Sequence, residues 1–405
     1  MHQDRSNVIV LGGGVGGVSA ALMACSLGLS VKLIEAADEC FPLLSLGSDR
    51  LFSATVYDWP HEHSCSHKFP YVDPLRDSAT ASKLRLTNDA LEFPDQAVTA
   101  ATLRRTFLDQ LETAKNKHGS RLEILEGHLI RTMDDITTNL SSKVVKVEAH
   151  KGSKPRHLTA QIVIFAIGFG LDKTNAQTEA AKDFFSYKDL KSHVDQAEAG
   201  GGSVRIIGAG DGGLQEALRF VLSDKWHDLH LCVSELQGML AAKGHSAAWS
   251  KLCARLQSAE DQAVRAAMWG YSDELVYGEL DAVYKREIEH LQKVAPDTLK
   301  SWHLSVVRHA GIRVELVDKS PYSRKVYALN RWLTGLLSSL SDPLSGLATL
   351  NRSAPGAMQV SADVELHRAG FAAADKQPQI GTASSDDLLR RIAFQGIPMS
   401  LDAVV

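Results

Sequence analysis

The sequence predicts an α/β protein that contains two βαβ units and a segment of long helices. Two short apolar runs, VIVL at 8–11 and VRII at 204–207, each lead into a turn with the glycine spacing G-x-G-x-x-G. Each turn precedes a run of small and apolar residues typical of a helix packed on a sheet, and then a further apolar run. A strand, a glycine turn, a helix and a parallel strand make up the Rossmann-like dinucleotide-binding unit, so the sequence predicts this unit twice.

The first unit contains every part of that pattern. We expect strands at Val8–Leu11 and Val31–Ile34 with a helix at Val18–Leu27 between them. Gly12 permits a tight turn, Gly14 leaves room for a pyrophosphate, and Gly17 lets helix and strand pack closely. Glu35 follows about 20 positions later, where a carboxylate accepts the ribose hydroxyls. The other expected nucleotide contacts in the turn are Gly13, Val15 and Gly16.

The second unit repeats this design after a flexible joint at 200–203. We expect a strand at Val204–Ile207, a helix at Leu214–Leu222 and a strand at Leu229–Val233. Gly208, Gly210 and Gly213 have the fingerprint spacing, and Glu235 is the expected ribose acid. Asp211 departs from the pattern, because its carboxylate would repel a pyrophosphate unless its side chain points away.

The two units resemble those of the two-dinucleotide-domain flavoproteins, which include glutathione-reductase-like oxidoreductases and flavoprotein monooxygenases. This resemblance implies that FAD binds at the first turn and NADH or NADPH at the second. The run AIG at 166–168 resembles the A-T-G segment that ends the FAD-binding part in that superfamily, which implicates Gly168. Glu235 is followed by no Lys or Arg in SELQGML, so we expect NADH to be preferred over NADPH. The alternative is a second unit kept for architecture or adapted to the substrate.

The resemblance also implies a division of the chain. We expect an FAD-binding part at 1–199, a second Rossmann-like domain of the NAD(P) type with a helical extension at 200–300, and a return segment at 301–405 that completes the FAD and substrate region. Within these parts the pattern predicts a helix at Val98–His118, a strand at Ile312–Val317 and a helix at Val326–Leu340. Arg331 in the last helix is a candidate anion contact, with a salt bridge as the alternative.

Candidate flavin or substrate contacts lie in the long polar and aromatic loop that follows Glu35. Those residues are Arg50, Tyr57, Asp58, Trp59 and His61. The alternative for this loop is a surface excursion anchored by Trp59 and Pro60. His61, His63, His67 and Cys65 do not have the spacing of a common structural zinc site, so we expect no metal there.

Composition narrows the class of partner. The chain has 405 residues, 44% of them hydrophobic, and a formal charge of −4 without a dense basic block. This argues against nucleic acid or an anionic membrane as the main partner and favours a small organic molecule. No run reaches the roughly 18–20 apolar residues of a membrane span, and no signal-peptide pattern is present. The five cysteines are scattered and lack C-x-x-C spacing, so we expect cytoplasmic residence and no disulfide exchange.

These observations predict an FAD-dependent oxidoreductase. Its flavin would be reduced by NAD(P)H and reoxidised by an organic substrate or oxygen, as in a monooxygenase or reductase. One alternative is an oxidase or dehydrogenase whose substrate, an amine or amino acid, reduces the flavin directly. Another is a non-catalytic protein that binds FAD or NAD. The oligomeric state is not predicted.

Overall fold

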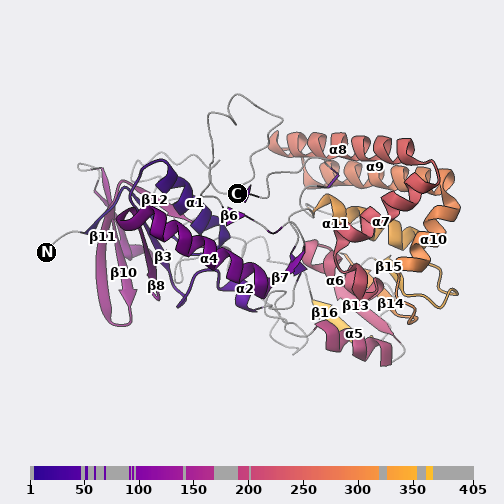
Figure 1. Ribbon diagram of the computed structural model, residues 1–405, viewed down its shortest axis with the longest axis horizontal. Helices are drawn as coiled ribbons and strands as arrows, with labels where there is room; N and C mark the ends of the chain where they lie inside the picture. Colours follow the sequence, from indigo (N-terminus) through magenta and orange to yellow (C-terminus); the bar gives the residue numbers. More distant parts are fainter. Residues whose placement is uncertain are drawn as a thin grey trace.

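A computed structural model gives the fold as two lobes, each built around a parallel four-stranded sheet (Figure 1). The structure describes residues 4–46, 51–52, 59–60, 68–69, 91–92, 94, 97–139, 143–167, 190–199, 202–318, 326–353 and 362–367. Within these ranges no helix is both long enough and apolar enough to cross a bilayer. The predicted α/β class is confirmed.

The first lobe contains the predicted N-terminal βαβ unit. Strand β2 (Val8–Leu11), helix α1 (Val15–Ser26) and strand β3 (Val31–Glu35) follow one another, and β2 pairs with β3 in parallel. Strands β8 (Leu122–Glu126) and β12 (Ile162–Phe165) complete the sheet in the order β12-β2-β3-β8. Every residue of β2 and β3 is buried, as expected for the centre of a sheet covered on both faces.

One face of this sheet is covered by α1 and by helix α4 (Ala100–His118). The apolar face predicted for α4 is confirmed, because Leu103, Phe107, Leu111 and Ala114 are buried. Thr99 caps this helix by accepting a hydrogen bond from the Thr102 N–H. Shorter elements lie nearby: α2 (Leu43–Leu46), β4 (Leu51–Phe52), β5 (Lys68–Phe69), β6 (Leu91–Glu92) and β7 (Val98–Thr99).

The other face packs against a second sheet with the order β1-β11-β10-β9. Its strands are β1 (Asp4–Arg5), β9 (Ile136–Asn139), β10 (Val144–Lys151) and β11 (Lys154–Ala160). Two short 3-10 turns, η2 (Gly119–Arg121) and η3 (Met133–Asp135), stand before β8 and β9. Alternate residues of β10, Val145, Val147 and Ala149, face the shared core.

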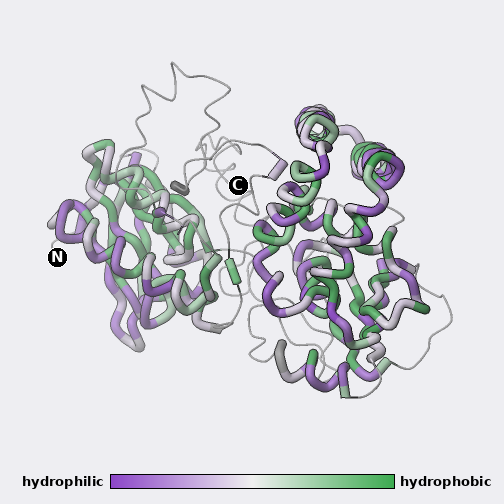
Figure 2. The backbone as a smooth tube through the Cα atoms, turned by 45° about the vertical axis from the view of Figure 1, so that its right-hand side comes forward, coloured by the Kyte–Doolittle hydropathy of each residue, from purple (hydrophilic) through white to green (hydrophobic). Residues whose placement is uncertain are grey.

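The second lobe repeats the strand arrangement of the first. Strands β13 (Ser203–Ile207), β14 (Arg313–Val317), β15 (Thr349–Ser353) and β16 (Val364–His367) form a parallel sheet in the order β15-β14-β13-β16. Helix α6 (Asp211–Val221) follows β13 as α1 follows β2. Helices α5 (Leu190–Ala199) and α11 (Ala328–Leu340) also belong to this lobe. Figure 2 shows the two lobes from a second direction, with apolar stretches in both.

The prediction of a strand at Leu229–Val233 is wrong. These residues begin helix α7 (Leu229–Ala242), capped by Asp228, whose carboxylate accepts hydrogen bonds from the N–H groups of His230 and Leu231. A short apolar run fits a buried helix turn as well as a strand, and here the helical spacing continues. The next strand along the chain that pairs with β13 is β14, which follows a helical insertion. The insertion comprises η4 (Asp224–Trp226), α7, α8 (Ser246–Met268), α9 (Asp273–Val294) and α10 (Pro296–Val306).

The described part of 301–405 belongs to the second lobe, and the expected return to the FAD region stays a prediction, because residues 368–405 lie outside the described residues. Strands β14, β15 and β16 complete the sheet of the second lobe through parallel pairing with β13 and with one another. Trp302 and Trp332 are fully buried in the core of that lobe. A parallel sheet needs strands from distant sequence, and the C-terminal strands supply them here.

Candidate functional site

The first glycine turn is shaped by close contacts within the chain. Gly12 has φ +105°, and its N–H donates to the Ile34 carbonyl at 2.8 Å. A Cβ on Gly12 would lie 2.3 Å from the Ala166 carbonyl oxygen, and one on Gly17 would lie 1.8 Å from the Gly12 carbonyl oxygen. These two glycines are therefore required by the packing of β2, α1 and the end of β12.

Gly14 is not required by any such contact. It precedes α1 with φ −73° and ψ −177°, a conformation open to any residue, and a Cβ there would meet no atom of the described residues within 4 Å. A Cβ on Gly16 would also face open space. No side chain caps the N-terminus of α1. The space beside Gly14 thus lies over unpaired helix N–H groups, which is the arrangement that binds a phosphate.

Glu35 is held beside this turn. Its side chain is buried, with one carboxylate oxygen accepting from the Gly13 N–H at 2.5 Å and the other from the Ala37 N–H at 2.7 Å. Both bonds come from the backbone, so the carboxylate has a fixed position at the end of β3. The residues of the turn and the acid therefore fit the pyrophosphate and ribose of a dinucleotide.

The second turn has nearly the same conformation as the first. Gly208 has φ +111°, and its N–H donates to the Val317 carbonyl at 2.9 Å. Gly210 precedes α6 with φ −73° and ψ 175°. Within the part of the chain that the structure describes, no side chain caps the helix and a Cβ on Gly210 would meet no atom within 4 Å. Gly213 is buried in the first turn of α6. The chain therefore builds the same open helix N-terminus twice.

The side chain of Asp211, the first residue of α6, points toward the N-terminal end of helix α11. Its carboxylate accepts hydrogen bonds from the Tyr327 N–H at 2.8 Å and from Nδ2 of Asn330 at 2.7 Å. Burial raises the pKa of Asp211, and these two bonds and the charge of Arg331 oppose that rise. The side chain that could repel a pyrophosphate is thus tied to the N-terminal end of α11.

Glu235 does not lie at the end of a strand. It is exposed in the middle of helix α7, and it does not follow a strand that pairs with β13. The residue that occupies the place of Glu35 is Asp318. In the first sheet Leu11 pairs with Ile34 and Glu35 follows, whereas in the second Ile207 pairs with Val317 and Asp318 follows.

Asp318 could be found from the sequence only by recognising VELVD as the second strand. The helical insertion places it far beyond the usual spacing of about 20 residues after the glycines. Its side chain is mostly buried, and one carboxylate oxygen lies 3.8 Å from Nη2 of Arg352 at the end of β15. This pair lies at the carboxyl edge of the parallel sheet, where α/β proteins bind ligands.

Most of the candidates in the loop after Glu35 lie outside the described residues. Those residues are Arg50, Tyr57, Asp58, His61, His63, Cys65 and His67, and the same holds for Gly168. Trp59 is described, and its ring packs against Trp332 of α11 with 5.7 Å between ring centroids. Arg331 is buried, forms an ion pair with Asp281 and lies 3.8 Å from Glu260, which agrees with the salt-bridge alternative.

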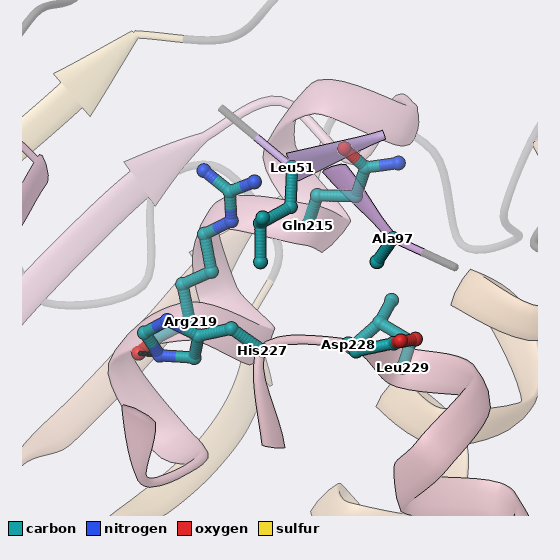
Figure 3. A pocket seen from close by; sticks show the side chains of 7 residues that line it. All are labelled: Leu51, Ala97, Gln215, Arg219, His227, Asp228 and Leu229. Carbon is teal, nitrogen blue, oxygen red and sulfur yellow. Dashed lines mark hydrogen bonds between the residues drawn. The ribbon is translucent and has the colours of Figure 1, made fainter. Parts of the chain in front are cut away.

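A small cavity lies where β4 and β7 meet α6 and the start of α7 (Figure 3). Its volume is about 30 Å³, room for little more than one water molecule. Burial lowers the pKa of His227 in its wall. The lining residues are Leu51, Ala97, Gln215, Arg219, His227, Asp228 and Leu229. The cavity is too small for an organic substrate in this conformation.

No family model and no curated protein matches the chain. Among solved structures, a bacillithiol disulfide reductase from Staphylococcus aureus aligns at 16% identity over 54% of this chain and 54% of its own, with a TM-score of 0.34. A flavin-containing monooxygenase from Stenotrophomonas maltophilia aligns at 17% identity over 54% of this chain and 55% of its own, with a TM-score of 0.35. A structure of OTEMO in complex with FAD and NADP aligns at 11% identity over 91% of this chain and 72% of its own, with a TM-score of 0.40.

The chain thus covers about half the length of the first two structures. TM-scores below 0.5 mark a distant likeness, so these structures do not establish the function of this chain.

Proposed function

We propose that the protein is an FAD-dependent oxidoreductase with FAD at the first glycine turn. The observation that supports this most directly is the open space beside Gly14, a position where no contact among the described residues requires glycine. The N-terminus of α1 would bind the pyrophosphate through backbone N–H groups, and Glu35 would accept hydrogen bonds from the adenosine ribose. Gly13, Val15, Gly16 and Gly17 form the rest of this cradle.

We further propose a nicotinamide nucleotide at the second turn. The N-terminus of α6, beside Gly210, would bind its pyrophosphate, and Gly208 and Gly213 would give the turn its shape. Asp318 replaces Glu235 as the proposed ribose acid, because it follows β14 as Glu35 ends β3. A carboxylate at this point accepts the 2′-hydroxyl of NADH and repels the 2′-phosphate of NADPH, so the proposed preference is for NADH. A preference for NADPH would instead mean that Arg352, 3.8 Å from this carboxylate, binds the 2′-phosphate.

The chemistry would belong to the cofactor, since bound FAD accepts a hydride and passes electrons to an organic substrate or to oxygen. The chain's part is to position the two nucleotides and to supply fixed charges. Burial raises the pKa values of the Cys40 and Cys232 thiols, which makes both poor nucleophiles. This favours a monooxygenase or a reductase without a cysteine intermediate over thiol chemistry at these positions.

Asp211 supports a second candidate, a flavin oxidase reduced directly by its substrate. A carboxylate at the first position of α6 is unfavourable for a second pyrophosphate even when it is tied to Tyr327 and Asn330. In that case the second lobe would serve the substrate or the architecture, and NADH would not bind.

The test is the absorbance spectrum of the purified full chain, followed by anaerobic addition of NADH or NADPH. We expect a flavin spectrum, release of FAD on denaturation, and faster bleaching by NADH than by NADPH. A protein that cannot be loaded with FAD contradicts the first proposal. A flavin that neither nucleotide bleaches or perturbs contradicts the second, and makes the substrate-reduced oxidase the better account.

A further inference from the structure

A cluster of titratable side chains lies on the second sheet of the first lobe, away from both glycine turns. Glu148 and His150 are two residues apart on β10 and so project from the same face, opposite to Val147 and Ala149 in the core. Asp135 ends η3, and the pairing of Ile136 with Val147 brings it beside Glu148. Three possible ligands thus meet, two from β10 and one from the turn that precedes β9.

The distances in this cluster are short and similar. Nε2 of His150 lies 3.5 Å from Oδ1 of Asp135 and 3.4 Å from Oε1 of Glu148. The three ligand atoms all lie within 4.8 Å of one another. His150 is only 7% exposed, and its Nε2 makes no hydrogen bond within the described part of the chain. A buried nitrogen of this kind costs free energy unless it acquires a partner.

In each carboxylate, the oxygen that does not face His150 contacts another group of the chain, which fixes the orientation of the carboxylate. Oδ2 of Asp135 accepts hydrogen bonds from the N–H groups of Arg131 at 2.7 Å and Thr132 at 2.9 Å. Oε2 of Glu148 lies 3.3 Å from Nδ1 of His157, the residue directly opposite on β11. Metal-binding carboxylates are typically oriented in this way by outer contacts.

We propose that Asp135, Glu148 and His150 bind a Zn²⁺ ion. Zinc bonds to nitrogen and oxygen are about 2.0–2.2 Å long, so tetrahedral ligands lie roughly 3.3–3.6 Å apart. The separations of 3.5 and 3.4 Å from Nε2 of His150 fall in that range. One imidazole and two carboxylates suit zinc better than Mg²⁺ or Ca²⁺, which prefer oxygen ligands alone. Water would complete the fourth position.

The site would hold the segment after β8 against β10. That segment starts beside the dinucleotide acid, since the His128 N–H donates to the Glu35 carbonyl, and Leu129 pairs with His150 through both backbone groups. A bound ion would therefore stabilise the connection between the two sheets of the first lobe. The site is independent of the proposed redox function.

The test measures zinc binding by the full chain after removal of metal with a chelator and dialysis. We expect calorimetry to give one tight Zn²⁺ site, and Co²⁺ in its place to give the visible absorbance of a tetrahedral complex. Asp135→Asn and Glu148→Gln should each weaken binding by roughly 10–100-fold or more. Both residues are partly exposed, so these variants are expected to fold, which far-ultraviolet circular dichroism would check.

The matched control is a quadruple variant that removes the metal-binding side chains of the loop after Glu35. Its substitutions are H61Q, H63Q, C65S and H67Q. This control should keep the tight site, and Zn²⁺ should raise the melting temperature of the control and of the wild type but not of Asp135→Asn. The proposal is overturned if the wild type shows no site tighter than about 10 μM. It is also overturned if the two carboxylate variants bind as tightly as the wild type, or if the control loses the site.

Discussion

In the first turn, one glycine is required by the fold and another would serve only the proposed ligand. Gly14 has ordinary backbone angles and open space at its Cβ, whereas a Cβ on Gly17 would clash with the Gly12 carbonyl. We expect Gly14→Val to fold normally and to bind FAD at least about tenfold more weakly, a loss of about 1.4 kcal/mol. Flavin content per chain, measured by absorbance, and the midpoint of urea denaturation check the two parts of this expectation.

Two further variants control this experiment. Gly17→Ala should reduce the free energy of unfolding by about 1–3 kcal/mol or more, because the strand and helix must separate. Gly238→Ala in α7, where a Cβ also meets nothing, should leave flavin content unchanged. Full flavin occupancy in a folded Gly14→Val protein would contradict the proposed FAD site.

Asp211 gives a prediction about pH. Because burial raises its pKa, folding shifts the protonation equilibrium of this carboxyl toward the neutral form. Its contribution to stability is therefore fully present below the unfolded value near 3.8 and is lost as pH rises through the higher folded value. We expect the difference in free energy of unfolding between Asp211→Asn and the wild type to move in favour of the variant as pH rises from about 3 to 7.

Asp363 provides a control with the opposite sign. Hydrogen bonds from the side chain and backbone of Ser203 lower the pKa of this carboxyl. Its contribution is present above pH 3.8 and is lost as pH falls through the lower folded value, so Asp363→Asn should lose stability relative to the wild type as pH rises. Chemical denaturation at several pH values measures both trends. Parallel trends for the two variants would contradict the assignment for Asp211.

The order of strands in the second sheet determines which acid would bind the ribose of the proposed second nucleotide. Asp318 follows the strand paired with β13, and Glu235 is exposed on α7. We expect Asp318→Asn to weaken NADH binding about tenfold, or about 1.4 kcal/mol, and to narrow the preference for NADH over NADPH. Anaerobic titration of the flavin spectrum with each nucleotide measures these quantities. Glu235→Gln is the matched control and should change neither, while the reverse pattern would show that the strand-end argument fails.

Local patterns in the sequence were enough to predict several elements. The βαβ unit from Val8 to Glu35, the buried face of α4 and the strand β14 all follow from short-range periodicity and turn chemistry. The region Leu229–Val233 was mispredicted because a five-residue apolar run is compatible with both a strand and a helix. The Asp228 cap and buried residues further along α7 favour the helix.

The candidate sites show the same limit. The glycine turn and Glu35 are close in sequence, so their spacing predicts their geometry. Asp318 meets the second turn only through the pairing of β13 with β14 across a helical insertion. Asp135 and His150 meet only through the pairing of β9 with β10. Strand pairing between separate segments depends on tertiary packing, which a single sequence does not show directly.

The two lobes have matching sheets, and a segment from the first half of the chain contacts the second lobe. Trp59 is half-buried against the core of that lobe and packs on Trp332, whose ring also contacts Trp249. Leu51 and Ala97, also from the first half of the chain, line the small cavity together with Gln215 and Arg219 of the second lobe (Figure 3). This contact gives Trp59 a packing role that would connect the loop after Glu35 to the second lobe.

Removing the Trp59 ring distinguishes this packing role from the expectation that Trp59 contacts flavin or substrate. A fully buried Trp→Ala change costs about 3–5 kcal/mol, so we expect Trp59→Ala, at a half-buried site, to cost about 1–3 kcal/mol in free energy of unfolding. Trp269→Ala is the matched control, because Trp269 is 84% exposed and its loss should cost less than about 0.5 kcal/mol. Denaturation followed by circular dichroism gives both values, and a double-mutant cycle with Trp332→Leu should show coupling between the two rings. If Trp59→Ala keeps its stability but alters the flavin spectrum or the rate of its reduction, Trp59 contacts the cofactor or substrate and the packing role is wrong.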